Sequence, residues 1–284
     1  MRVGFVSSAG IDRGRSDDAE AATRLGAELC VWDDPDVDWT GFDRVVVRSV
    51  WDYTADVNRF LAWCERVGPE RLRNRPDLIR FNADKRYLRA LGAPTVPTHF
   101  AGPGEALPAL AGEVVIKPNV SAGARDTGRF GPAEHDAARA LIAEIQASGR
   151  CALIQPYLPL IAERGERAIV YLGGAVSHVL TKRLVLDTPG IAPLGSGAHA
   201  PAAAMLADDL VRAGAASESE LALAAAVHAE ISTRFGAPLY ARIDLVPGLD
   251  GEPRLLELEV IEPCLYLQLA PGASARFADA IRAS

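Results

Sequence analysis

The chain of 284 residues is long enough for about two domains, and 49% of its residues are hydrophobic while 24% are charged. This balance supports a sizeable core and excludes a chain that is disordered throughout. A formal net charge of -7 and an aromatic content of 6% argue against a protein whose task is to grip nucleic acid.

The sequence lacks both a membrane or export segment and a disulfide pattern, and this indicates where in the cell the protein is expected. No run of about 18 apolar residues occurs, and the apolar run near the N-terminus is too short for an export signal. The four cysteines lie far apart without a C-x-x-C pair, a pattern typical of free thiols in a reducing compartment. We therefore expect a cytoplasmic protein that contacts neither a membrane nor nucleic acid.

Strand and helix signals alternate over about the first 75 residues. Short apolar runs at 3–6, 30–32 and 44–48 predict buried parallel strands, and helix formers at 16–29 and 56–67 predict the helices that connect them or follow them. Strands separated by helices indicate a small doubly wound α/β domain.

Residues 49–53 directly follow the third predicted strand. They lie at its carboxyl end, where open α/β sheets bind ligands. The alternative is an ordinary turn in which Trp51 packs on the core.

The pattern changes after about residue 76. Asn82 is the predicted N-cap of a helical segment that ends near Leu91. The further expected elements are a strand at 114–118, a loop of small residues at 121–128, a helix at 133–148, a strand at 152–155, a hairpin of 166–172 and 175–183, a mobile loop at 187–204, a helix at 221–235, and a hairpin of 239–246 and 254–261.

Acidic residues crowd the last hairpin. Arg242 and Asp244 share one strand face by the two-residue period, as do Glu257 and Glu259 on the return strand. If the strands pair about a turn centred near residue 250, Asp244 falls opposite Glu257 within a residue or so, and facing like charges destabilise a ladder. A divalent cation resolves the conflict, and oxygen ligands without His or Cys favour Mg²⁺. The alternative is a solvated face whose acids are neutralised by Arg242 and Arg254.

Two lysines beside a loop of small residues indicate a phosphate site. Lys85 lies in the helical segment, and Lys117 ends an apolar strand just before the loop at 121–128. Backbone N–H groups of such a loop can approach phosphate oxygens while lysine supplies a point charge. No G-x-x-x-x-G-K-[ST] and no complete G-x-G-x-x-G occurs, so a nucleotide site must be of another kind. The alternative for each lysine is a solvated charge at the end of an element.

In this order along the chain, the pieces resemble the ATP-grasp superfamily, and the resemblance covers essentially the full chain. Segments 47–53, 82–88 and 261–263 look most like the O-ureidoserine cyclo-ligase group, which makes the cycloserine ring. The resemblance implies an α/β (α+β) ATP-grasp fold. Its expected parts are a doubly wound pre-ATP-grasp domain at 1–75, an N-terminal ATP-grasp subdomain at 76–156, and a C-terminal subdomain at 157–284 that carries the metal hairpin.

The resemblance also implies ATP and Mg²⁺ as cofactors and gives roles to individual residues. Glu259 stands where most relatives have Asn, which together with Glu262 leaves the number of Mg²⁺ ions open. The expected Mg²⁺ ligands are Asp244, Glu257 and Glu259; the nucleotide contacts are Lys85, Lys117, Ser121, Ala122, Gly123, the adenine hinge Gln155, Pro156, Tyr157 and Leu158, and Glu163 or Glu166 at the ribose.

Further residues are assigned to the reacting groups. Arg242 can reach the γ-phosphate or an acyl phosphate, although a salt bridge to Glu257 or Glu259 is equally open. Lys182 or Arg183 could contact phosphates or a substrate carboxylate. Loops 121–128 and 187–204 are the predicted lids. The predicted substrate contacts are Arg48, Ser49, Trp51 and Glu262.

Three functions remain open from the sequence. The first is an ATP- and Mg²⁺-dependent ligase that activates a small amino-acid-like carboxylate as an acyl phosphate, with ring closure as one form of the attack. The second is an ATP-grasp kinase of small molecules, and the third is a non-catalytic nucleotide-binding module. The expected partner is a small-molecule substrate, and the sequence does not decide between a monomer and a dimer.

Overall fold

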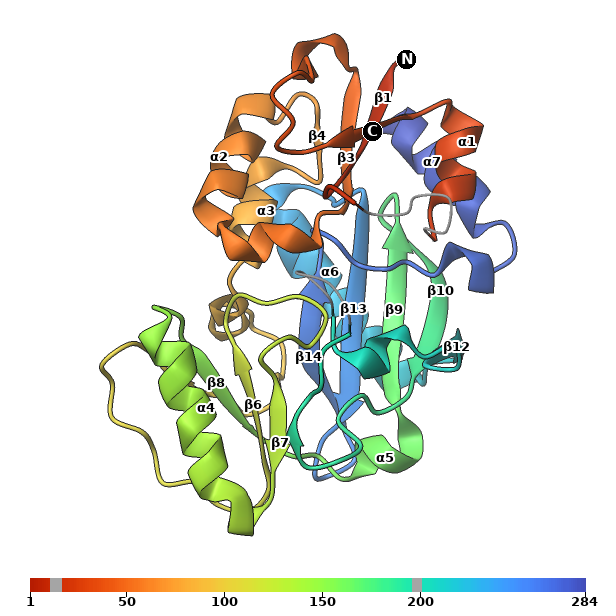
Figure 1. Ribbon diagram of the computed structural model, residues 1–284. Coiled ribbons are helices and arrows are strands. Elements are labelled where there is room, and N and C mark those ends of the chain that lie inside the picture. The colour runs from red at the N-terminus through yellow and green to blue at the C-terminus, as the bar shows by residue number, and fades with distance from the viewer. Residues whose placement is uncertain (11–16, 196–200) are drawn as a thin grey trace.

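The computed structural model of the chain describes residues 1–10, 17–195 and 201–284. Its strands form three sheets, one uppermost, one central and one at the lower left of Figure 1. Among the described residues no helix is long and apolar enough to cross a membrane.

The first sheet is parallel and has the strand order β2-β1-β3-β4. Its central strands are buried along their lengths, as expected for a parallel sheet covered on both faces. This confirms the small doubly wound domain. Its elements are β1 (Val3–Ser7), α1 (Ala19–Leu25), β2 (Glu28–Val31), β3 (Arg44–Ser49), α2 (Val57–Val67) and β4 (Leu72–Arg73).

The first helix is shorter than the sequence predicts. Ser16 lies outside the described residues, and α1 ends before Gly26, whose φ of 59° is left-handed and turns the chain into β2. The predicted range at 16–29 therefore merged a helix, its cap and the beginning of a strand.

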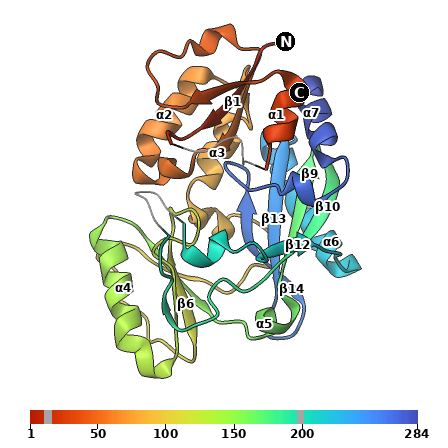
Figure 2. The same cartoon turned by 45° about the vertical axis from the view of Figure 1, so that its right-hand side comes forward.

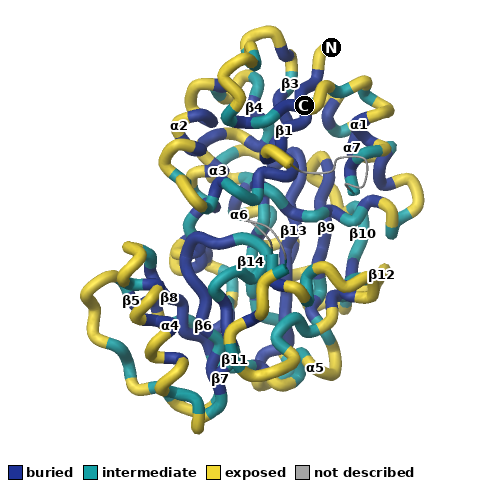
Figure 3. The backbone as a smooth tube through the Cα atoms, viewed as in Figure 1, coloured by how far each residue is buried: buried dark blue, intermediate teal, exposed yellow. Residues whose placement is uncertain are grey.

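The lower sheet is antiparallel with the order β11-β7-β6-β8-β5. Helix α4 packs its apolar side on this sheet and leaves its outer side exposed (Figure 3). The elements are β5 (His99–Ala101), β6 (Val114–Pro118), β7 (Gly128–Phe130), α4 (His135–Ala147), β8 (Ala152–Pro156) and β11 (Gly190–Ile191).

The central sheet is antiparallel with the order β12-β10-β9-β13-β14. Helix α6 packs on one face of this sheet and α7 packs on the other face, as both Figure 1 and Figure 2 show. The elements are β9 (Glu166–Leu172), β10 (Ala175–Lys182), β12 (Val211–Ala213), α6 (Glu218–Phe235), β13 (Tyr240–Pro247), β14 (Pro253–Glu259) and α7 (Ala273–Ala283).

Side-chain alternation on β13 separates its apolar and charged residues. Ile243 and Leu245 point into the core under α6, so Arg242 and Asp244 occupy the opposite face. On that face Tyr240 joins the apolar cluster under α7, which leaves the two charged residues at the part of the sheet that faces the cavity described below.

The segment that joins the first two sheets corrects one prediction. Asn82 is the last residue of helix α3 (Pro76–Asn82), not an N-cap. The following short helix (Lys85–Arg89) is capped by Asp84, whose side chain accepts a hydrogen bond from the Arg86 N–H. Asn82 instead donates to the Leu258 carbonyl at 2.7 Å and accepts from the Val260 N–H at 3.2 Å, and so holds β14.

The expected mobile loop at 187–204 contains ordered structure in its described part. Strand β11 pairs with β7, and a 3-10 helix begins at Ala203. Residues 196–200 lie outside the described residues. The domain limits at residues 75 and 156 remain predictions.

Candidate active site

One cavity of about 390 Å³ lies where the three sheets approach one another. Most of the side chains that the sequence analysis proposed for the site line it. These are Trp51, Lys85, Lys117, Ser121, Ala122, Gly123, Gln155, Pro156, Tyr157, Leu158, Glu166, Lys182, Arg242, Asp244, Glu257, Glu259 and Glu262.

Three predicted site residues are absent from the described lining of this cavity. Glu163 is exposed on the short helix α5 (Leu160–Arg164), so the structure does not support it as a ribose contact. Arg48 and Ser49 border a second cavity of about 430 Å³ between the first sheet and α1. The structure therefore does not place them in the main cavity, and their direct contact with substrate stays a prediction without support from this geometry.

Arg48 holds in place the segment after β14 that forms one wall of the main cavity, from the side away from the cavity. Its guanidinium donates to the Asp18 carboxylate at 2.7 Å and to the Pro263 carbonyl at 2.9 Å. Asp17 accepts hydrogen bonds from the Leu265 and Tyr266 N–H groups at 2.5 and 2.6 Å. The first domain thus holds the segment that follows β14, whose side chains line the cavity.

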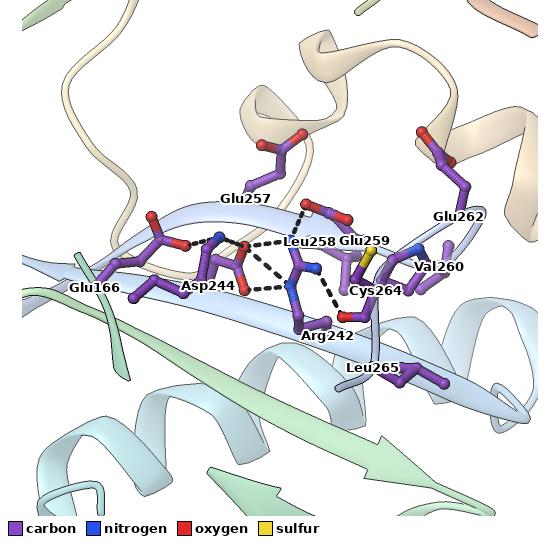
Figure 4. Close-up of polar contacts among 12 residues, drawn as sticks. Glu166, Arg242, Asp244, Glu257, Leu258, Glu259, Val260, Glu262, Cys264 and Leu265 are labelled. Carbon is purple, nitrogen blue, oxygen red and sulfur yellow. Dashed lines mark hydrogen bonds and ion pairs between the residues drawn. The ribbon is translucent and has the colours of Figure 1, made fainter. Parts of the chain in front are cut away.

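The acidic hairpin has the predicted register. Asp244 pairs with Glu257, and Arg242 pairs with Glu259. Arg242 Nε donates to Asp244 Oδ1 at 2.9 Å, and its Nη2 donates to Asp244 Oδ2 at 2.9 Å and to Glu259 (Figure 4). The salt bridge between Arg242 and Glu259 that the sequence left open is present.

Lys182 extends this charged network across the sheet. It lies opposite Glu166 in the β9–β10 ladder, and its Nζ bonds the Glu166 carboxylate and, at 2.9 Å, Asp244 Oδ2. Ala168, the β9 residue paired with Asp244, is small enough to leave space for this crossing. Arg183 instead lies at the exposed rim, bonded to Asp209.

The carboxylic acids of the network differ in their pKa values. Burial opposes ionisation of Asp244, but Arg242 and Lys182 outweigh it and hold the pKa of Asp244 well below its usual range. Burial raises the pKa of Glu166 and of Glu259 to about 7, and the neighbouring Asp244 charge adds to both shifts. The cations present therefore do not fully compensate the buried acids.

A divalent cation fits the chemistry of this donor set. Glu257 and Glu259 keep 25% and 24% of their side chains exposed toward the cavity, and all available donors are carboxylate oxygens. Within the described ranges no three acids are already arranged around one ion. Cation binding thus requires the carboxylates to exchange arginine and lysine for the metal.

All three lysines of the chain line the cavity, whereas the rest of the 30 Lys and Arg residues are arginines. Lys85 Nζ donates to the Ser121 carbonyl at 2.7 Å and pairs with Glu257 at 3.1 Å. Buried Lys117 has no hydrogen bond or ion pair in the described part of the chain, and burial lowers its pKa. This scarcity of lysine was a signal in the sequence that the motif analysis did not use.

The small-residue loop closes one side of the cavity. Gly123 has a φ of +63°, and a Cβ there would lie 2.5 Å from Pro201 Cβ, so this approach requires glycine. The Gly123 carbonyl accepts from the Ala202 N–H at 2.7 Å, and the Thr127 carbonyl accepts from the Ala192 N–H at 2.8 Å. The two predicted lids are therefore joined to each other.

The predicted hinge lies beside an apolar part of the cavity. The Tyr157 N–H donates to the Glu113 carbonyl at 2.8 Å, and the Gln155 side chain donates to Thr98 at 2.8 Å. Val246 and Leu256 provide apolar walls that suit a flat base.

The motif analysis missed other lining residues. Cys264 and Tyr266 follow Glu262 at a two-residue interval, and all three border the cavity while the residues between them are buried. This extended-chain period was the signal available for them.

Comparisons with known proteins agree with this geometry. The sequence family described as the N-terminal domain of D-cycloserine synthetase DcsG matches residues 4–74. The cycloserine biosynthesis protein DcsG of Streptomyces lavendulae is 34% identical over 281 residues, which cover 92% of this chain and 90% of that protein.

Solved structures give the same result. The crystal structure of D-cycloserine synthetase DcsG has a TM-score of 0.83 and 31% identity, and covers 99% of this chain and 98% of its own. D-alanine–D-alanine ligase from Bacillus anthracis, complexed with ATP, shares the fold with a TM-score of 0.66 at 14% identity, covering 100% of this chain and 96% of its own. The chain therefore belongs to the DcsG family of ATP-grasp, ATP-dependent ligases.

Proposed function

We propose that the protein uses ATP and Mg²⁺ to activate the carboxylate of a small amino-acid-like substrate as an acyl phosphate. A nitrogen of the same substrate molecule then attacks, in a cycloserine-type ring closure. The observation that carries the proposal is the meeting of Lys85, Lys117 and the Asp244–Glu257–Glu259 hairpin in one cavity. The similarity to D-cycloserine synthetase supports ring closure over other ligations.

The nucleotide would bind between the lower and central sheets. Adenine suits the apolar walls beside Gln155 and Tyr157, where backbone groups of the hinge can bond its edge. Lys117 has an unpaired charge at the next position along the cavity, and the loop from Ser121 supplies backbone N–H groups; both suit phosphate oxygens. Glu166 remains the only proposed ribose contact, although its bond to Lys182 also places it beside the phosphates.

The hairpin carboxylates would hold Mg²⁺. When bound, the ion would neutralise charge on the phosphoryl oxygens during transfer. Asp244 keeps its negative charge over the whole physiological pH range because Arg242 and Lys182 stabilise it. Glu257 and Glu259 would turn from their basic partners toward the ion, which frees Lys85 and Arg242 for the phosphates.

The proposed reaction has two steps. A substrate carboxylate oxygen attacks the γ-phosphorus, the bond to the β-phosphate oxygen breaks, and ADP leaves. A nitrogen of the substrate then attacks the acyl carbon and expels inorganic phosphate. Arg242 would stabilise the negative charge of the acyl phosphate, and the joined loops at Gly123 and Ala202 would keep water from hydrolysing it.

The test is ADP release from ATP and Mg²⁺ with O-ureidoserine as substrate, with and without hydroxylamine. A ligase that forms an acyl phosphate yields a hydroxamate in the presence of hydroxylamine. A kinase releases ADP and yields a stable phosphorylated product without hydroxamate. Absence of ADP release with O-ureidoserine and a panel of other amino acids would contradict the proposal.

A further inference from the structure

One acid of the cavity lies against the first domain and is held without a cation. Glu262 follows β14 and lines the cavity together with Trp51 and Tyr53. The Tyr53 hydroxyl lies beside the Glu262 carboxylate and lowers its pKa, and Trp51 Nε1 donates to the Glu262 carbonyl at 3.3 Å. Both contacts fix the position of Glu262, and neither brings a positive charge.

The other acids of the cavity contrast with Glu262. Each has a lysine or arginine partner: Lys182 for Glu166, Lys182 and Arg242 for Asp244, Lys85 for Glu257, and Arg242 for Glu259. Over the described ranges of the chain, Glu262 forms no ion pair. Figure 4 shows it apart from the Arg242–Glu259 pair.

Glu262 is partly buried, and burial of a carboxylate without a cation is unfavourable. In agreement, burial first and the nearby Glu259 charge second raise the pKa of Glu262 to about 8. A ligand that brings a positive charge would remove this cost, whereas a ligand carboxylate or phosphate at the same place would increase it. The position therefore selects for a cationic group.

The aromatic neighbours favour the same kind of group. Trp51, Tyr53 and Tyr266 line the same cavity as Glu262, two from the first domain and one from the segment after β14. Aromatic ring faces attract ammonium groups, and they exclude water that would weaken the charge pair.

We propose that Glu262, held by Tyr53, binds the α-ammonium group of the substrate and so selects α-amino acids over the corresponding carboxylic acids without the amino group. This assignment rests on the proposed ligase function. It defines the substrate as a zwitterion whose ammonium group lies at Glu262 and whose carboxylate faces Arg242 and the phosphates.

The experiment compares two ligands on the full-length protein. One is O-ureidoserine, and the other is its analogue with hydrogen in place of the α-amino group. Calorimetry with Mg²⁺ and a non-hydrolysable ATP analogue gives Kd, and ADP release gives KM and kcat. The variants are Glu262→Gln, Tyr53→Phe and, as a matched control, Glu144→Gln on the exposed side of α4.

We expect the wild-type protein to bind O-ureidoserine about 30-fold or more tightly than the analogue, because the buried charge pair is lost with the amino group. Glu262→Gln should remove this preference by weakening the amino acid alone, with KM raised more than kcat is lowered. Tyr53→Phe should reduce the preference about 3- to 10-fold, and Glu144→Gln should leave it unchanged. Melting curves show whether each variant is folded.

Several results would overturn the assignment. They are a Glu262→Gln variant that keeps the preference, one that loses both ligands equally, and a wild-type protein that binds both equally or neither. If ADP release with the analogue were as fast as with O-ureidoserine, the proposed ligase function would stand, and the proposed binding of the ammonium group by Glu262 would be wrong. If no carboxylate caused ADP release but binding still depended on Glu262, the proposed ligase function would be wrong instead.

Discussion

The charged groups of the cavity fall into two regions that behave differently. On the central sheet, Arg242 and Lys182 share Asp244 between them, so that each cation has an acid partner in the ligand-free protein. Elsewhere in the cavity, and within the described part of the chain, neither Lys117 nor Glu262 forms an ion pair. Paired charges hold the sheet together, and unpaired charges mark the places where a ligand must supply the opposite sign.

The largest expected effect is at the centre of the paired region. Asp244→Asn removes the charge that both Arg242 and Lys182 bind, so we expect ADP release to fall about 10³-fold and the free energy of unfolding to fall by about 3 kcal/mol. Steady-state assays and denaturant titration measure the two quantities. Asp250→Asn, in the exposed hairpin turn, is the control. An Asp244→Asn protein of unchanged stability would show that the pairing does not hold the sheet.

The second prediction contrasts the two lysines. Lys117→Met should weaken ATP binding about 100-fold, since a buried charged contact is lost, without lowering the free energy of unfolding. Lys85→Met should weaken ATP binding and also destabilise the protein, because Glu257 then loses its partner. Calorimetry with ATP and denaturant titration test both variants. The contrast fails if Lys117→Met is the less stable of the two.

The third prediction concerns pH and the unpaired acid. Burial raises the pKa of Glu262 from an ordinary 4.5 to about 8 in the folded protein, so the folded state binds the proton more tightly than the unfolded state. Its contribution is fully present below pH 4.5 and is lost as the pH rises toward 8. We expect Tm of the ligand-free protein to fall by a few degrees across this range. Glu262→Gln should reduce that fall, and an equally steep profile in this variant would contradict the assignment.

The smallest expected effect lies behind the cavity wall. Asp17→Asn keeps the shape but weakens the acceptor for the Leu265 and Tyr266 N–H groups. We expect a stability loss of about 1 kcal/mol and a KM for the amino-acid substrate raised about threefold, with ATP affinity unchanged. Asp279→Asn on the exposed side of α7 is the control. If Asp17→Asn changed the ATP affinity and left KM for the amino-acid substrate unchanged, the segment that Asp17 holds would not form part of the substrate site.

The paired region was the part of the site that the sequence predicted best. Two-residue alternation fixes the faces of a hairpin, so Asp244 could be placed near Glu257 to within about a residue; the exact pairing depends on the bulge between Asp244 and Leu245. The resemblance then supplied the order of Lys85, Lys117 and the hinge. The α/β class and the parallel first sheet were also predictable, because buried parallel strands are continuous apolar runs.

Long-range contacts were not predictable in the same way. Arg48 lies near the carboxyl end of β3, where open α/β sheets usually bind ligands, yet its bonds to Asp18 and the Pro263 carbonyl depend on how distant segments pack. Asn82 has the composition of a helix cap, but its partners are 176 and 178 residues away. Helix α7 was not predicted, because its apolar stripe is short and can be recognised as a buried face only when the sheet that it covers is known.

The restriction of lysine to the cavity has a practical consequence for chemical labelling. Apart from the amino terminus, every primary amine of the protein faces the same chamber. Lys85 and Lys182 are held as ammonium ions by acids, while burial favours the uncharged and therefore nucleophilic form of Lys117. Among the three lysine side chains a mild acylating reagent thus has one preferred target, Lys117, and protection of that amine by nucleotide would report occupancy without any knowledge of the substrate.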